Sequence, residues 1–306
     1  MYMRLFENIG VFNGILLKRY NIQLPKIKYR RNTIKGTLKF KNNVVVITGA
    51  SSGIGKACAY EFAGQGAKVV LAARRESELK KVEDELKKQG GDAFSVKTDV
   101  RKIEDCKNLI DKTVEKYNRI DVLINNAGIS MRANFDDLDL SVIKELMDTN
   151  FYGTVYATKF ALPFLKKQKG TVIGISSITG LTPLPGRTGY AASKHAMDGF
   201  LNTLRLENIK KGLHVLIVHP GFTNSNIRKL ALNKNGKPQK ETPRDEAKMM
   251  SSEKVAQIIA RATLKREKDL ILTREGKLVV WLHKNFPGIT DRIILQEMAK
   301  EQDAPF

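Results

Sequence analysis

A tyrosine, a lysine and a serine supply the residue types for acid–base chemistry in this chain. Tyr190 and Lys194 stand four positions apart, and Ser177 precedes Tyr190 by 13 residues. Residues four positions apart share one face of a helix, so the ammonium group can lie beside the phenol and favour its deprotonated form. Bringing the pKa of tyrosine from about 10 to near 7 takes roughly 4 kcal/mol, which one lysine and a positively charged cofactor can supply. Tyr190 is therefore a candidate acid/base, although a Tyr-x-x-x-Lys pattern alone also fits an ordinary surface pair.

The composition is that of a folded protein without a disulfide framework. The chain has 306 residues, of which 42% are hydrophobic, and this is enough for a sizeable core. Its two isolated cysteines fit buried thiols in a reducing compartment, so we predict a cytoplasmic location. The histidines show no ligand spacing and we expect no metal site. They are His195, His214, His219 and His283.

Positive charge dominates the chain. The formal net charge is +21, and residues 1–43 hold ten Lys or Arg against a single acidic residue, Glu7. Clustered basic residues can neutralise phosphates, but elsewhere the two signs alternate as on a solvated helix face, for example over residues 78–88. The sequence carries no signature of a nucleic-acid-binding module. We therefore expect no nucleic-acid partner.

Both ends of the chain are predicted to extend a central domain over residues 41–275. Residues 1–40 form a basic extension without a secretory signal, and its apolar stretch is far shorter than the roughly 20 residues that span a membrane. This extension fits a poorly ordered tail or a weak contact with an anionic membrane surface. Residues 276–306 form an apolar, helical extension. It fits packing on the core or on a partner subunit, or contact with a membrane or a hydrophobic substrate.

Strand and helix patterns alternate along the central domain. Short apolar runs rich in β-branched residues predict five buried strands, at residues 44–47, 68–72, 122–124, 172–175 and 214–218. Apolar residues spaced near 3.6 apart predict helices. These helices cover residues 56–65, 76–89, 102–117, 140–167 and 190–211. The alternation predicts an α/β fold, a doubly wound, Rossmann-type parallel sheet with helices on both faces and a ligand at the carboxyl ends of the strands.

The first predicted strand leads into a glycine-rich turn and the start of a helix. Glycines permit a tight turn and a close backbone approach, while the free amides and positive dipole end of a helix attract a pyrophosphate. The turn therefore predicts a dinucleotide site. Its residues are Gly49, Ser51, Ser52, Gly53, Ile54 and Gly55.

The residues after the second predicted strand bear on the choice of cofactor. A carboxylate commonly binds the ribose hydroxyls of NAD(H) there, whereas a guanidinium can hold the 2′-phosphate of NADP(H). Ala73 stands where the acid is expected, and Arg74 and Arg75 follow it. We predict NADP(H) rather than NAD(H), with Arg74 in the site. A pair of exposed arginines at a helix start is the alternative.

In their order along the chain, these motifs resemble the short-chain dehydrogenase/reductase family in its single-domain form. The resemblance covers about residues 41–260 and rests on Thr48-Gly-x-x-x-Gly-x-Gly55, Asp99-Val100, Asn125-Asn-Ala-Gly128, Asn150, Ser177, Tyr190-x-x-x-Lys194 and Pro220-Gly221. It implies that Asp99 and Val100 flank the adenine and that Asn126, Ala127 and Gly128 line the adenosine side. It also implies that Pro220, Gly221 and Thr223 cover the nicotinamide. Family members often carry a threonine four residues after that glycine, where this chain has Ser225.

The resemblance also implies an activity, that of an NAD(P)-dependent dehydrogenase/reductase acting on CH–OH groups. Hydride passes between the nicotinamide and a carbonyl carbon, while Tyr190 exchanges the proton and Ser177 hydrogen-bonds the oxygen. Lys194 stabilises the phenolate and binds the nicotinamide ribose, and Asn150 holds a water near Lys194 as a proton relay. A homodimer or homotetramer built on the helix of Tyr190 is implied as well.

The substrate is the least determined part of this interpretation. Apolar residues at 129–131 and 181–185, with a lid over residues 222–252, favour a small-molecule apolar carbonyl or secondary alcohol such as a steroid or retinoid. A 3-oxoacyl thioester reductase, whose basic surface meets an acidic carrier protein, is an alternative. A non-catalytic, nucleotide-binding regulatory protein of the same fold is the rival class. The complete set of candidate catalytic residues argues against that rival.

Overall fold

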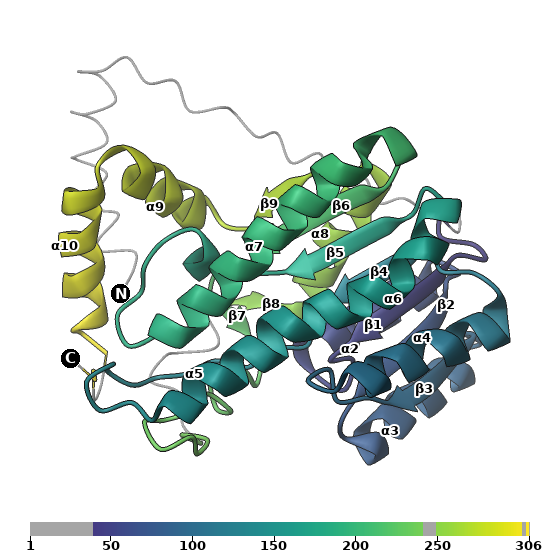
Figure 1. Ribbon diagram of the computed structural model, residues 1–306, viewed down its shortest axis with the longest axis horizontal. Coiled ribbons are helices and arrows are strands. Elements are labelled where there is room, and N and C mark those ends of the chain that lie inside the picture. The colour runs from purple at the N-terminus through teal and green to yellow at the C-terminus, as the bar shows by residue number, and fades with distance from the viewer. Residues whose placement is uncertain (1–38, 241–248, 302–303, 306) are drawn as a thin grey trace. The chain divides into compact units, whose positions relative to one another are not determined.

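Seven parallel strands form the main sheet, in the order β3-β2-β1-β4-β5-β6-β9 (Figure 1). The computed structural model describes residues 39–240, 249–301 and 304–305. The strands are β1 (Val44–Thr48), β2 (Lys68–Ala73), β3 (Ala93–Lys97), β4 (Val122–Asn125), β5 (Thr171–Ile175), β6 (His214–His219) and β9 (Asp269–Ile271). A second, two-stranded sheet pairs β7 (Thr223–Asn224) with β8 (Met250–Ser251). Residues 1–38 of the predicted extension and 241–248 of the predicted lid lie outside the described residues.

The predicted fold class is confirmed, and all five predicted strands are present. The strand count was wrong, because β3 and β9 were not predicted. In β3 the residues Phe94 and Ser95 are only half-buried, and in β9 Asp269 is exposed. Neither strand is therefore a continuous apolar run, which is the signal of a strand buried on both faces. Both lie at the edges of the sheet, where less burial is required.

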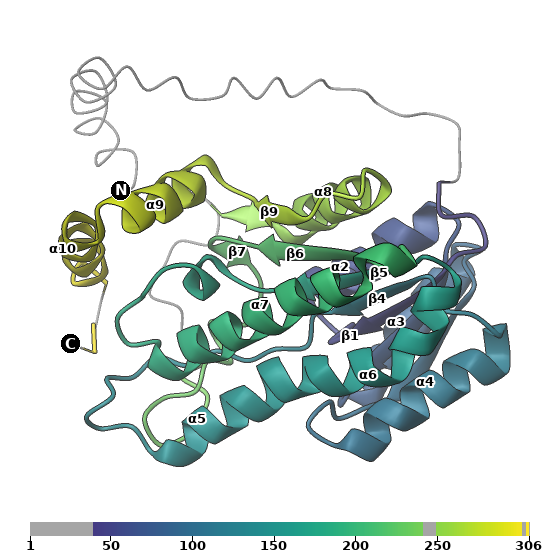
Figure 2. The same cartoon turned by 45° about the horizontal axis from the view of Figure 1, so that its top comes forward.

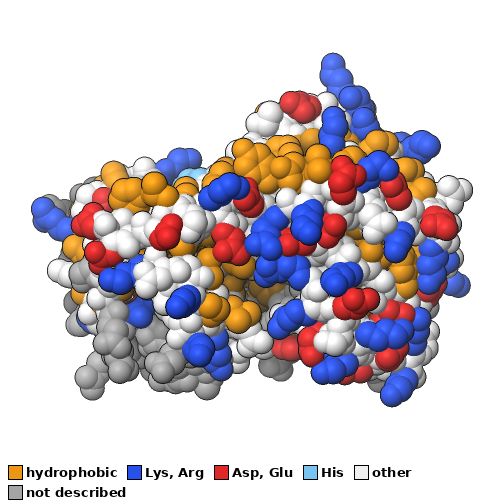
Figure 3. Space-filling view, turned by 60° about the horizontal axis from the view of Figure 1, so that its bottom comes forward, with side chains coloured by type: hydrophobic (Ala, Val, Ile, Leu, Met, Phe, Trp, Pro, Cys, Tyr) orange, Lys and Arg blue, Asp and Glu red, His pale blue; other side chains and the backbone are white. Residues whose placement is uncertain are grey.

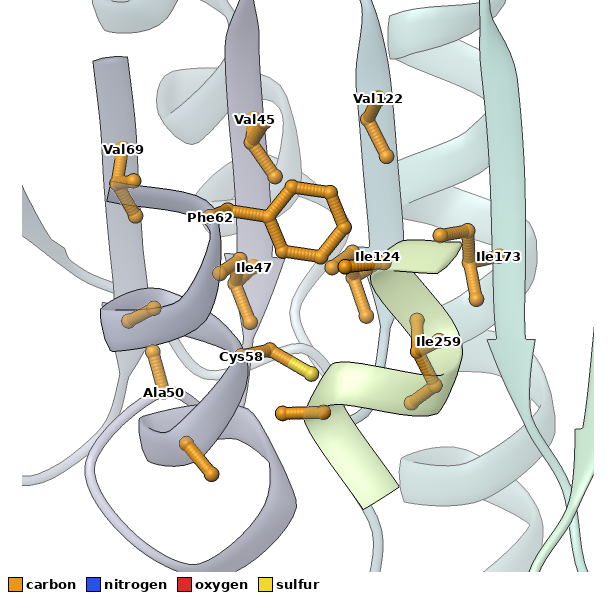
Figure 4. Packing of buried hydrophobic residues seen from close by; sticks show 14 of the residues in the cluster. Val45, Ile47, Ala50, Cys58, Phe62, Val69, Val122, Ile124, Ile173 and Ile259 are labelled. Carbon is orange, nitrogen blue, oxygen red and sulfur yellow. The ribbon is translucent and has the colours of Figure 1, made fainter. Parts of the chain in front are cut away.

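Helices cover both faces of the sheet (Figures 1 and 2). Val45 and Ile47 of β1 point to one face and join a buried cluster with Phe62 (Figure 4), while Val46 points to the other face and joins a cluster with Leu109. This alternation follows from the two-residue period of a strand. The first cluster is covered by α2 (Gly53–Gly64), α3 (Glu76–Lys88) and α8 (Ser252–Leu264), and the second by α4 (Ile103–Tyr117), α6 (Gly153–Lys167) and α7 (Thr188–Asn208).

The helix predicted over residues 140–167 is not continuous. It divides into α5 (Leu140–Leu146), a π-helical turn at Met147–Tyr152 and α6. A π turn contains more residues than an α turn and is frequent at functional sites. Asn150 lies in this turn and is fully buried. Apolar periodicity carries no information about such a widened turn, so the break was not predictable from spacing.

Two helices form the C-terminal extension, α9 (Arg274–Asn285) and α10 (Pro287–Met298). Several of their large apolar side chains are exposed, including Trp281 at 41% and Ile289 at 58%. The chain after α10 returns to the main body, where Glu301 lies 3.6 Å from Arg132 in an ion pair. No helix within the described ranges is long and apolar enough to cross a membrane. On the face in Figure 3, basic and acidic side chains are interspersed around patches of hydrophobic side chains.

Candidate active site

The predicted site segments gather at one edge of the sheet. The strands are parallel, so the residues that follow them all emerge at the carboxyl edge. The strand order reverses between β1 and β4, and ligands of doubly wound sheets bind at such a switch point. The segments at this edge are residues 49–55, 74–75, 99–100, 126–128, 176–177 and 220–223.

Hydrogen bonds hold the glycine-rich loop, residues 49–55, to the segment after β4, residues 126–128. The Asn126 side-chain amide donates to the backbone oxygens of Thr48 (2.9 Å) and Gly49 (3.2 Å). The Thr48 hydroxyl accepts from the N–H groups of Asn126 (3.0 Å) and Ala127 (3.1 Å). Gly49 has a φ of +68°, and a Cβ at Gly55 would overlap Asn126 Nδ2 and Gly49 O. Both glycines are therefore required by the structure of the loop, and the Asn126 side chain holds the loop in place by its hydrogen bonds.

The start of α2 offers an anion-binding site. Ser52 is the N-cap and makes no side-chain capping bond, and the first turn of α2 has no acidic residue. The free amides at this end and the helix dipole both favour a negative group. Gly53 has a φ of +55°, and a Cβ on it would lie 3.3 Å from Ser225 Cβ. The hydroxyl-bearing Ser225, which replaces the threonine frequent in the family, thus lies beside the loop.

Arg75, rather than Arg74, contacts the loop. Arg75 Nη2 lies 3.1 Å from both Ser51 Oγ and Ser52 Oγ. Both side chains are exposed; Arg75 is the N-cap of α3, and Arg74 directly follows β2. The sequence analysis placed Arg74 in the site, whereas the structure brings Arg75 to the loop serines, since α3 begins directly after Arg75. The loop, the open helix start and this guanidinium fit the phosphates of a dinucleotide.

Asp99 and Val100 follow β3 and are held by their own neighbours. The carboxylate of Asp99 accepts from Arg101 Nε (3.0 Å) and Nη2 (2.6 Å). Burial would raise the pKa of Asp99, but the hydrogen bonds and charge of Arg101 lower it overall. Val100 is buried, and a Cβ on Gly153 would lie 2.7 Å from Val100 Cγ2. The carboxylate of Asp99 is thus already paired with an arginine.

Asn150 is fixed between two segments. Its Oδ1 accepts from the Ile129 N–H (2.9 Å), and its Nδ2 donates to the Ile129 carbonyl (3.0 Å) and to Ser193 Oγ (2.9 Å). A Cβ on Gly128 would lie 3.1 Å from Asn150 Oδ1 and 3.6 Å from Lys194 Nζ. Asn150 and Lys194 therefore both lie beside Gly128.

Ser177 begins a short 3₁₀ turn, Ile178–Gly180, directly after β5. Its Oγ accepts from the backbone N–H (3.2 Å) and the hydroxyl (2.9 Å) of Thr179. A serine hydroxyl has one proton and two acceptor sites. Since Thr179 fills the acceptor sites, the proton of Ser177 is left to donate to a third oxygen.

Tyr190 and Lys194 lie on α7 with the lysine beside the aromatic ring. Lys194 Nζ is 5.9 Å from the ring centroid of Tyr190 and donates to the Ile175 carbonyl (2.8 Å). Burial lowers the pKa of Lys194 to about 8, and the charge of Asp198 opposes this. Burial raises the pKa of Tyr190, while a hydrogen bond from Ser177 and the charge of Arg187 oppose the rise. The pKa of Tyr190 is thus raised above 10, opposite to the lowering toward about 7 that the spacing predicted, because burial outweighs the groups that oppose it.

The segment after β6 lies beside the serine turn. The Pro220 carbonyl accepts from the Ile178 N–H (3.2 Å), and a Cβ on Gly221 would lie 3.3 Å from Ile178 Cδ1. Thr223 is buried in β7 and donates its hydroxyl proton to the Gly221 carbonyl (3.3 Å). Pro220 and Gly221 thus lie beside Ile178, the residue after Ser177, and Thr223 is bonded to Gly221.

Part of the predicted lid contacts the predicted pocket wall. Leu232 donates its N–H to the Ser130 carbonyl, and Arg132 donates its N–H to the Leu232 carbonyl, both at 2.8 Å. Leu232 and Met131 are buried in one apolar cluster, and Tyr190 packs against it. An apolar surface therefore adjoins the candidate acid/base.

The fold and this arrangement of residues define a class of protein. A sequence model of the family described as short chain dehydrogenase matches residues 43–236. This chain belongs to the short-chain dehydrogenase family.

Individual relatives agree with this assignment. The chain is 45% identical over 190 residues to 11-beta-hydroxysteroid dehydrogenase-like 4A of Arabidopsis thaliana, and the match covers 61% of this chain and 63% of that relative. It is 34% identical over 276 residues to dehydrogenase/reductase SDR family protein 7-like of Drosophila melanogaster, covering 87% of this chain and 85% of that relative. The chain thus spans less than two thirds of the length of the Arabidopsis relative.

Solved structures share the fold. An alcohol dehydrogenase from the archaeon Thermococcus sibiricus, complexed with 5-hydroxy-NADP, superimposes with a TM-score of 0.66 at 27% identity, over 76% of this chain and 96% of that one. A short chain dehydrogenase/reductase from Burkholderia phymatum, in complex with NAD, gives a TM-score of 0.74 at 23% identity, over 82% of this chain and 96% of that one. The second structure supports the fold alone.

Proposed function

We propose that this protein is an NADP(H)-dependent oxidoreductase that transfers a hydride between nicotinamide and an apolar carbonyl or secondary alcohol, with Tyr190 as the acid/base. The observation that carries the proposal is that Lys194 of α7 and Asn150 of the π turn both lie beside Gly128, with the ring of Tyr190 next to Lys194. Three separate elements bring these groups together, which an ordinary surface Tyr/Lys pair does not require. When bound, the nicotinamide supplies or accepts the hydride.

The residues of the chain control the proton and the oxygen. In reduction Tyr190, held protonated by burial, donates its proton to the developing alkoxide. Ser177 donates its remaining proton to the same oxygen and so stabilises the charge. Lys194, charged below a pKa of about 8, stabilises the phenolate that remains and binds the nicotinamide ribose. Asn150 orients a water near Lys194 through which the proton is replaced.

The preference for NADP(H) rests on Arg75 and its position at the loop serines. A guanidinium at this place gives charge-assisted bonds to a 2′-phosphate, worth about 1.5–3 kcal/mol each. Arg75→Ala is expected to weaken NADPH binding by roughly 10- to 100-fold and to leave NADH binding nearly unchanged. Arg74→Ala is the matched control, with a smaller effect. Fluorescence titration with both cofactors measures this, and equal losses for NADPH and NADH in Arg75→Ala would contradict it.

The apolar cluster beside Tyr190 supports an apolar substrate. The name of the Arabidopsis relative, a steroid dehydrogenase-like protein, points to the same class. The test is NADPH oxidation with steroid, retinal, aromatic-ketone and 3-oxoacyl thioester substrates. Turnover of ketones or aldehydes is expected. Turnover of the thioesters alone would replace this substrate class by the thioester alternative, and binding of NADPH without any turnover would favour a regulatory protein.

A homodimer or homotetramer built on α7 is part of the proposal. Leu206 near the end of α7 is 66% exposed and Ile209 after it 57%, and Tyr152 of the neighbouring π turn is exposed as well. Exposed apolar side chains on α7 and on the turn packed against it are available for association with a partner. Sedimentation of the purified protein measures the oligomeric state. The cytoplasmic location and a membrane-surface contact through either extension stay predictions.

A further inference from the structure

The last two helices, α9 and α10, begin beside the serine turn. Thr273 is the N-cap of α9, and its hydroxyl accepts from the Gly276 N–H (2.9 Å). A Cβ on Gly276 would overlap Ile178 Cδ1, and a Cβ on Gly221 would lie 3.5 Å from Thr273 Cγ2. Ile178 directly follows Ser177. The first turn of α9 therefore packs against the part of the candidate site that holds the serine.

The chain after α10 returns to the apolar surface beside Tyr190. Glu301 Oε2 lies 3.6 Å from Arg132 Nε, and the two side chains are only 6% and 11% exposed. Arg132 directly follows Met131, which is buried in the apolar cluster against which Tyr190 packs. This nearly buried ion pair therefore joins the end of the chain to the predicted pocket wall.

A second contact lies near this ion pair. A Cβ on Gly186 would lie 2.8 Å from Pro305 Cγ, so Pro305 packs closely on the backbone of Gly186. The Ala133 N–H donates to the Gly186 carbonyl (3.1 Å). Gly186 directly follows residues 181–185, the other stretch predicted to line the pocket. The end of the chain thus contacts both stretches of the predicted wall.

The helices α9 and α10 connect these contacts. Figures 1 and 2 both place them beyond the carboxyl ends of the strands, where the candidate site lies. Thr290 and Met298 of α10 are buried, whereas Ile289 is exposed. Leu278 and Leu282 of α9 stand four positions apart, on one face of the helix, and are half-buried. Each helix therefore has a covered face, and α9 offers apolar side chains on its own.

We propose that the C-terminal segment, residues 273–301, forms the outer wall of the substrate site and that the Arg132–Glu301 ion pair holds this wall closed. The inference rests on the proposed function, which takes the substrate oxygen to lie at Ser177 and Tyr190. A long apolar substrate that extends beyond these residues would touch the segment, whereas a small ketone would not. Arg132 and Glu301 are positioning residues, because they act by holding the wall.

The first test needs no substrate and measures how strongly acrylamide quenches the fluorescence of bound NADPH. Glu301→Gln keeps the shape of the side chain but removes the charge that attracts Arg132, so the segment should open. The quenching constant should then rise at least about 2-fold. NADPH affinity should stay at the wild-type value, because other residues form the glycine-rich loop. Glu297→Gln is the matched control, since its carboxylate pairs with Lys300 of the same segment, and it should behave as the wild type.

Charge reversal tests whether the two side chains act on each other. Arg132→Glu places two carboxylates together, so quenching should rise more than in Glu301→Gln. Adding Glu301→Arg to Arg132→Glu restores opposite charges, and the quenching constant should return toward the wild-type value. Arg132→Met serves as the opened variant should Arg132→Glu fail to fold.

The second test compares KM for a steroid ketone with KM for a small aromatic ketone. In Glu301→Gln, KM for the steroid should rise at least about 3-fold while its kcat is unchanged, as for a lost contact that the ground state and the transition state share. Both constants for the small ketone should stay at the wild-type values. This split distinguishes a lost outer wall from damage to the catalytic groups.

The outcomes separate this inference from the proposed function. Wild-type quenching in Glu301→Gln overturns the inference, as does a reversed pair that stays as open as Arg132→Glu or an equal rise in KM for both ketones. If quenching changes as expected but no ketone is reduced, the inference about the wall stands and the proposed activity fails. If ketones are reduced and quenching is unchanged, the activity stands and the inference fails. A wild type that binds no NADPH contradicts both.

Discussion

Replacing Gly55 by alanine is expected to break the hydrogen bonds by which Asn126 holds the glycine-rich loop. The new Cβ would overlap Asn126 Nδ2 and Gly49 O, so Asn126 must give up its bonds to the Thr48 and Gly49 carbonyls. Two lost hydrogen bonds cost about 2 kcal/mol, and residual overlap with the backbone adds about 1–3 kcal/mol. The higher helix propensity of alanine offsets about 1 kcal/mol of this loss in unfolding free energy. The expected net loss in unfolding free energy is about 2–4 kcal/mol.

Gly64→Ala provides the matched control on the same helix. A Cβ at Gly64 would meet no atom within 4 Å, so this variant should gain up to about 1 kcal/mol. Urea unfolding measures both variants, and NADPH titration should show weaker binding only for Gly55→Ala. The reasoning is refuted if the two variants unfold at the same urea concentration, because the close approach at Gly55 would then have no energetic consequence.

Two further predictions concern pH and thiol reactivity. Burial would raise the pKa of Glu83, but hydrogen bonds from Lys87 and Ser95 lower it from 4.5 to about 2. The ionised carboxylate therefore stabilises the folded state above pH 4.5, and this contribution is lost as the pH falls toward 2. On acidification, the unfolding free energy of Glu83→Gln should fall by about 3 kcal/mol less than that of the wild type. Urea unfolding above and below pH 4.5 measures this difference. An unchanged acid dependence would refute the prediction. Burial raises the pKa of both Cys58 and Cys106, the latter to about 12. Neither thiol should therefore react with a thiol reagent in the native protein, and both should react after unfolding. Absorbance measures the labelling, and rapid labelling of the native protein would contradict this prediction.

The central strands could be predicted because each is buried on both faces. Val44–Thr48 of β1 and His214–His219 of β6 are buried at every position, so each reads as a continuous apolar run, apart from the histidines at both ends of β6. The edge strands β3 and β9 have no such signal. The parallel sheet with helices on both faces then followed from the alternation of strands with helices, since crossovers between parallel strands are right-handed.

The chemistry of the site could be predicted from residue type and spacing, but its geometry could not. Tyr190 and Lys194 share a face of α7 as their spacing requires. The π turn around Asn150 could not be predicted, because hydrogen bonds to distant Ile129 and Ser193 select it.

The most direct test of the account is the rate of NADPH oxidation by Tyr190→Phe with a ketone that the wild type reduces. The variant should fold and bind NADPH as the wild type does, because only a hydroxyl is removed. Its turnover should fall by at least about 100-fold, the usual contribution of a positioned proton donor. Tyr117→Phe, on α4, should keep full activity. Turnover of Tyr190→Phe at the wild-type rate would contradict the assignment of Tyr190 as the acid/base.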